Sequence, residues 1–102
     1  MKMKQPEASI AIQVLPEVNG EDVIRIVDKV IAYIKSTGLN MHVGPFETTV
    51  VGDFDVLMEI VKESQLICIR EGAPGVASYI KIFYNPNAGV WPIDKKISKH
   101  NE

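Results

Sequence analysis

Apolar residues recur at every second position near the start of the chain. Within residues 8–15, Ile10, Ile12 and Val14 fall on one side of an extended backbone. The residues between them are Ser9, Ala11 and Gln13. A period of two predicts a β-strand with one apolar face and one small, polar face. Pro16 follows and is expected to end the strand.

Two longer segments have the spacing of a helix instead. Residues 19–36 carry apolar side chains at steps of three and four, which predicts a helix with a broad apolar stripe. Residues 53–70 predict a second helix, with Asp53 as its N-cap. Its expected buried stripe consists of Phe54, Leu57, Met58, Val61 and Cys68, with Ile60 and Ile67 alongside.

The remaining segments complete an α+β fold. Residues 39–52 predict a β-hairpin that turns within residues 44–47, and residues 76–84 predict a last strand. Residues 92–99 are expected to form a short C-terminal helix. The order β-α-β-β-α-β is that of the ferredoxin-like split β-α-β sandwich, with two helices on one face of a four-stranded antiparallel sheet. We expect residues 1–102 to form a single domain.

This arrangement is expected to leave the second face of the sheet without a covering element. The residues assigned to this open face are Ser9, Ala11, Gln13, Glu47, Thr49, Val51, Tyr79, Lys81 and Phe83. Aromatic side chains gathered on the surface of a small domain favour an interface over a solvated face. The unpaired edge strands point the same way, so self-association is expected.

Composition and charge exclude several classes of function. The chain has a formal net charge of -2, which gives no basic surface for nucleic acid. The single cysteine forms no internal disulfide, so a reducing, cytoplasmic location fits best. The apolar run in residues 8–15 is broken by polar residues, and no segment approaches the length of a membrane span.

Three other proteins of similar topology were considered as alternatives. An acylphosphatase-like enzyme requires an Arg in the loop after the first strand, and residues 16–20 contain none. An RNA-binding domain stacks bases on sheet aromatics, and Tyr79 and Phe83 lie on a suitable face, but the central strands lack the paired aromatics and the surrounding basic residues. A metal-binding or regulatory trimer requires ligands at suitable spacing, and His42 and His100 stand far apart. Cys68 falls on a buried helix stripe, which favours packing over catalysis.

Three stretches of the sequence resemble one known family. They are residues 9–16 (SIAIQVLP), residues 44–54 (GPFETTVVGDF) and residues 93–99 (IDKKISK). Together they resemble the MTH1187/YkoF-like thiamine-binding proteins, also called DUF77, over about residues 8–99. The family's hairpin has Pro, Thr and Glu-Gly. Pro45, Thr48 and Gly52 match this pattern, whereas Val51 stands in place of the Glu.

The resemblance implies a non-enzymatic protein that forms homodimers, or homotetramers, and requires no cofactor or metal. The implied ligand is thiamine or its hydroxymethylpyrimidine half, bound at or near a subunit interface. The hydroxyl and amide groups would match an aminopyrimidine, an aromatic ring would stack on it, and a carboxylate would face the thiazolium cation. The expected ligand-binding residues are Ser9, Gln13, Phe46, Glu47, Thr48, Thr49 and Tyr79. The alternatives are an interaction domain without a ligand and an uncharacterised enzyme of this fold.

Overall fold

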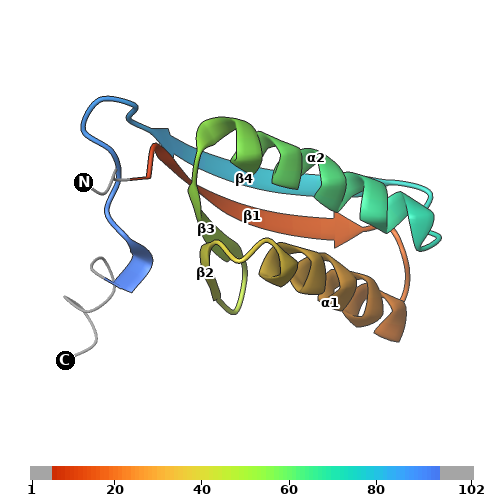
Figure 1. Ribbon diagram of the computed structural model, residues 1–102. Helices are drawn as coiled ribbons and strands as arrows, with labels where there is room; N and C mark the ends of the chain where they lie inside the picture. Colours follow the sequence, from red (N-terminus) through yellow and green to blue (C-terminus); the bar gives the residue numbers. More distant parts are fainter. Residues whose placement is uncertain (1–5, 95–102) are drawn as a thin grey trace.

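Six elements follow one another in the predicted order (Figure 1). The computed structural model describes residues 6–94. The strands are β1 (Ala8–Pro16), β2 (Asn40–Val43), β3 (Thr48–Gly52) and β4 (Val76–Tyr84), and the helices are α1 (Glu21–Ser36) and α2 (Phe54–Arg70). The α+β class and the β-α-β-β-α-β order are therefore confirmed.

The four strands form one antiparallel sheet in the order β2-β3-β1-β4. The central pair is β1 and β3, as the split β-α-β order requires. β1 pairs with β4 along its whole length, from Ala8 opposite Tyr84 to Pro16 opposite Val76. Its pairing with β3 is shorter and ends where Ile12 lies opposite Thr48. The last four residues of β1 therefore have a neighbouring strand on one side only.

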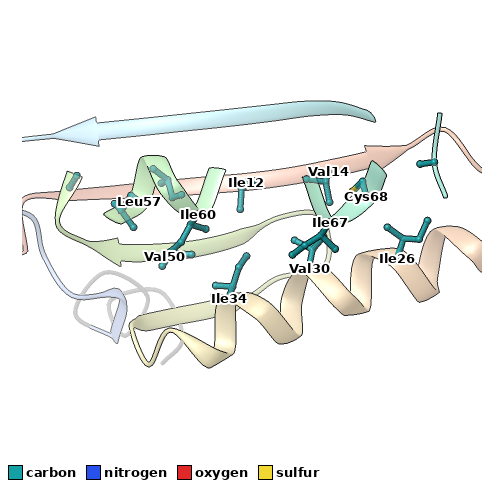
Figure 2. Close-up of a cluster of buried hydrophobic side chains, with 13 residues drawn as sticks. Ile12, Val14, Ile26, Val30, Ile34, Val50, Leu57, Ile60, Ile67 and Cys68 are labelled. Atoms are coloured by element: carbon teal, nitrogen blue, oxygen red, sulfur yellow. The ribbon is translucent and has the colours of Figure 1, made fainter. Parts of the chain in front are cut away.

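The core lies between the sheet and the two helices (Figure 2). From the sheet, Ile10, Ile12, Val14 and Val50 point toward the helices. From α1, Ile26, Val30 and Ile34 are buried, on the stripe that the period predicts. The fully buried side of α2 is Leu57, Ile60, Ser64, Ile67 and Cys68. Phe54, Met58 and Val61 are only partly buried, because the 3.6-residue helical period places them to one side of this buried stripe.

The start of α2 is capped by a residue distant in sequence. Asp53 occupies the N-cap position but makes no hydrogen bond there through its side chain. Instead, the Phe54 backbone N–H donates to Glu7 Oε1 at 3.0 Å. Glu7 precedes β1, so this bond joins the start of the sheet to the start of α2. The carboxylate also lies at the positive end of the helix dipole.

The open face of the sheet is not bare, which corrects one expectation. Val51 points to this face and is 2% exposed, and it packs against Val90 and Ile93, at 3% and 4%. We call residues 85–94 the strap. The strap is held to the start of the chain by bonds from Asn85 N–H to the Glu7 carbonyl and from Val90 N–H to the Pro6 carbonyl, both 2.8 Å. The chain therefore covers one end of this face itself.

The predicted C-terminal helix over residues 92–99 is not shown. The described residues end at Asp94, and most of the segment lies beyond them. Within the described part of the segment, Ile93 is buried and packs with Val51 and Val90.

Candidate functional site

The unequal lengths of β1 and β3 create a pocket at the edge of the sheet. β3 begins at Thr48 opposite Ile12, whereas β1 continues to Pro16. Beyond Thr48 the hairpin turns back, and the Gly44 N–H donates to the Glu47 carbonyl at 2.9 Å. A pocket of about 210 Å³ opens between this turn, the end of β1 and the side of α1. We call it the slot.

The walls of the slot are mostly apolar. α1 contributes Val23, Val27, Val30, Ile31 and Ile34, and β1 contributes Ile12, Val14 and Leu15. The hairpin contributes Val43, Gly44, Pro45 and Phe46. Three polar side chains, those of Gln13, Glu47 and Thr48, also line it. Apolar walls with a few polar groups are the usual composition of a site for a small organic ligand.

The rim of the slot carries an aromatic ring and an ion pair. Phe46 is 78% exposed at the hairpin turn, where its ring is available to cover a bound ligand. Lys81 Nζ lies 3.3 Å from Glu47 Oε1, reaching across β1 from β4. Both side chains contact solvent, so the pair contributes little to stability. It holds the carboxylate near the mouth of the slot.

A second hollow lies on the open face. It has about 170 Å³ and is lined by Ser9, Ala11, Thr49, Lys81, Ile82 and Phe83. The register explains this set, because Ala11 is paired with both Thr49 and Lys81, and Ser9 is paired with Phe83. Lys81 therefore stands between the two hollows, since its ammonium group bonds Glu47 at the slot.

The residues expected to bind a ligand are divided between these two places. Gln13, Phe46, Glu47 and Thr48 line the slot. Ser9 and Thr49 line the second hollow. Tyr79 lines neither of the two and lies exposed on β4, opposite Gln13. Consecutive residues of a strand face opposite sides, which is why Thr48 and Thr49 separate.

Several lining residues were not among the sequence-based candidates. The helix wall of the slot, with Val23, Val27 and Ile31, was assigned to the core, and Val14 was assigned to the apolar face of β1. Their apolar pattern is the same as that of core residues. The slot results from the mismatch between the nine-residue β1 and the five-residue β3, which the strand register shows and the sequence pattern does not.

Val51 occupies the position where the resembling family has Glu. Here it is buried beneath the strap, packed against Val90 and Ile93. Its role in this chain is therefore packing, and a carboxylate at this position would be buried without water.

Among residues 6–94, the residues considered for catalysis or metal binding are Cys68 and His42. Cys68 is fully buried, and burial raises the pKa of its thiol, which disfavours the reactive thiolate. His42 lies exposed on β2, opposite Thr49. Within residues 6–94 no three His, Cys, Asp or Glu side chains come together as metal ligands. His100 lies outside the described residues. In the same range, neither helix is long and apolar enough to cross a membrane.

Comparison with known proteins identifies relatives across nearly the whole chain. A family model described as "Thiamine-binding protein" matches residues 10–101. A UPF0045 protein of Clostridium perfringens is 49% identical over 92 residues, covering 90% of this chain and 95% of the relative.

Solved structures agree with the sequence relatives. A Bacillus cereus protein of the DUF77 group superimposes with a TM-score of 0.86 at 37% identity, covering 95% of this chain and 92% of that one. A Thermotoga maritima protein, described as a candidate thiamine biosynthesis/salvage protein, has a TM-score of 0.81 at 31% identity, covering 94% of this chain and all of that one (100%). The chain is therefore a member of the thiamine-binding protein family, the UPF0045 or DUF77 group.

Proposed function

We propose that this protein binds thiamine or its hydroxymethylpyrimidine half in the slot, without catalysing a reaction. The observation that carries the proposal is an apolar pocket with three polar side chains in a member of a family named for thiamine binding. The description of the Thermotoga maritima structure, which links that protein to thiamine biosynthesis or salvage, supports the same class of ligand.

The volume of the slot favours one half of the vitamin. Pockets that enclose drug-sized ligands usually measure roughly 300–1,000 Å³. The slot, at about 210 Å³, is smaller and suits a single substituted ring. We therefore assign the pyrimidine ring to the slot, with the thiazolium ring of thiamine outside it, near Glu47 at the rim.

Each polar residue of the slot has a role in this proposal. The Gln13 amide and the Thr48 hydroxyl both donate and accept hydrogen bonds, so they match the nitrogen atoms and hydroxyl group of the pyrimidine. The Phe46 ring covers the flat face of the ligand. The Glu47 carboxylate stabilises the thiazolium cation, in competition with the Lys81 ammonium group that it already contacts. Ser9, Thr49 and Tyr79 have no direct part in the slot.

We also propose that the protein works as a homodimer or homotetramer that meets through the part of the open face that the strap leaves uncovered. Tyr79 and Phe83 are large and exposed there, and Leu15 is exposed at the end of β1. Leu15 also lines the slot, so a second chain on this face would close the slot from the outside. This places the ligand near a subunit interface.

Two neighbouring threonines allow a matched test. Thr48→Val removes a hydroxyl from the slot and leaves the shape of the side chain nearly unchanged. Thr49→Val makes the same change on the opposite face, in the second hollow. Titration calorimetry with hydroxymethylpyrimidine should show an affinity loss of about fivefold or more for Thr48→Val only, since a lost hydrogen bond costs ~1 kcal/mol. A loss of affinity in Thr49→Val alone would contradict the proposed site and would indicate binding in the second hollow.

A further inference from the structure

The hydrogen bonds between β1 and β4 show toward which neighbouring strand each backbone N–H and C=O of β1 points. Two bonds extend the pairing of β1 with β4, from Glu17 N–H to the Gly75 carbonyl and from Asn85 N–H to the Glu7 carbonyl. Both involve odd-numbered residues of the β1 segment. Backbone groups of a strand alternate sides, so the even-numbered residues direct their N–H and C=O toward β3.

Toward β3, the ladder ends before β1 does. On β1, Ala8, Ile10 and Ile12 lie opposite residues of β3, which are Gly52, Val50 and Thr48 in that order. The next even-numbered residue, Val14, has no residue of β3 opposite it. No hydrogen bond joins Val14 to the hairpin turn within the described residues 6–94. Its N–H and C=O therefore point into the slot without a partner on β3.

The free part of this edge is one residue long. Pro16 has no N–H to offer, and its carbonyl already accepts the Val18 N–H at 2.9 Å. Strand addition by a peptide uses a row of such groups, and only Val14 is available here. One donor beside one acceptor instead suits the edge of a small flat molecule.

The Val14 backbone groups differ from the polar side chains that line the slot. Among the residues that the structure describes, no buried side-chain nitrogen or oxygen lacks a hydrogen-bond partner. Val14 is 7% exposed and lines the slot, toward which its backbone N–H and C=O are directed. Unlike the Gln13 and Glu47 side chains, these groups are fixed in direction by the pairing of β1 with β4.

We infer that the backbone N–H and C=O of Val14 form the recognition element of the slot, and that it selects ligands with an adjacent hydrogen-bond donor and acceptor on one edge. An aminopyrimidine has this edge, with its exocyclic amino group beside a ring nitrogen, and so does a cyclic amide. A bound ligand of this class continues the β1–β3 ladder by one pair. The inference rests on the proposed function and states which chemical feature of the ligand is read.

A ligand pair tests the inference without changing the protein. One probe is hydroxymethylpyrimidine with its amino group, and the other carries a methyl group in place of the amino group. Calorimetry on the full chain should show binding weakened at least about tenfold for the methyl analogue, because the Val14 carbonyl is left without a donor. Equal affinity for both probes would overturn the inference and leave the proposed function standing. Absence of binding by the amino probe would refute both.

A backbone substitution gives the second test. Val14→Pro removes the N–H that faces the slot and leaves the bonds between β1 and β4 in place. Val76→Pro is the matched control, because by the same alternation the Val76 N–H faces the outer edge of β4, away from the slot. Val14→Pro should bind the amino probe at least about tenfold more weakly, while Val76→Pro should bind like the parent. Unchanged binding by a folded Val14→Pro variant would contradict the inference. If this variant does not fold, the comparison of the amino and methyl probes on the parent protein decides the question.

Discussion

Replacing Ile93 with Ala tests the strap that covers one end of the open face. Ile93 is 4% exposed and packs with Val51 and Val90 in a cluster separate from the main core. The substitution deletes three buried carbon atoms, at ~0.8 kcal/mol each, which gives about 2.4 kcal/mol. A small cluster near the surface collapses easily, so the cavity adds little and we expect a loss of about 2.4 kcal/mol. That corresponds to a fall of roughly 10–19 °C in the melting temperature.

The single tryptophan makes the assay specific. Trp91 lies between Val90 and Ile93 in the strap, so its fluorescence reports the strap while far-UV circular dichroism reports the helices. Unfolding of Ile93→Ala in urea should begin at a lower concentration by fluorescence than by circular dichroism. The control is Ile24→Ala, because Ile24 is 64% exposed on α1 and its loss should cost less than about 0.5 kcal/mol. The reasoning is refuted if Ile93→Ala lowers the free energy of unfolding as little as Ile24→Ala does.

Three further predictions follow from individual contacts. Glu7→Ala should lower the free energy of unfolding by ~1 kcal/mol because α2 loses its cap, while Glu7→Gln, which keeps an acceptor oxygen, should lose less; urea unfolding of both variants measures this. Cys68 should not react with a thiol reagent at pH 8 until the protein unfolds, because the thiol is buried and its pKa is raised; reaction in native protein would contradict this. Since the unfolded thiol ionises near pH 9.0 while the native thiol keeps its proton, stability should fall as the pH rises above that value, and less so in Cys68→Ala.

The strands and their faces could be predicted from the sequence. Ile10, Ile12 and Val14 alternate with Ser9, Ala11 and Gln13 so regularly that the period of two predicts which side packs against the helices. The register then pairs Ser9 with both Val51 and Phe83, which places these candidate open-face residues on one face.

Features that depend on contacts between distant segments could not be predicted. The cap of α2 comes from Glu7, whereas Asp53 is the nearest suitable residue in the sequence. The strap depends on Val90 and Ile93 meeting Val51, and nothing in their local pattern indicates this contact.

The candidate site was predicted only in part, because it too depends on contacts between distant segments. Gln13, Phe46, Glu47 and Thr48 were candidates and meet in the slot. The slot itself exists because β1 continues past Ile12, whereas its partner β3 has its first residue, Thr48, opposite Ile12. The lengths of the two strands are known only from this register. Val14 was interpreted as a core residue, and it is one, but it also lines the slot.

The position of the ligand is tested most directly by an NMR titration of the protein with hydroxymethylpyrimidine, followed through the backbone amide signals. We predict saturable shifts in residues 13–15, 44 and 46–48, with the Val14 amide among the largest. Shifts confined to Ser9, Thr49 and Phe83 would place the ligand in the second hollow. No shift at any ligand concentration would contradict the account.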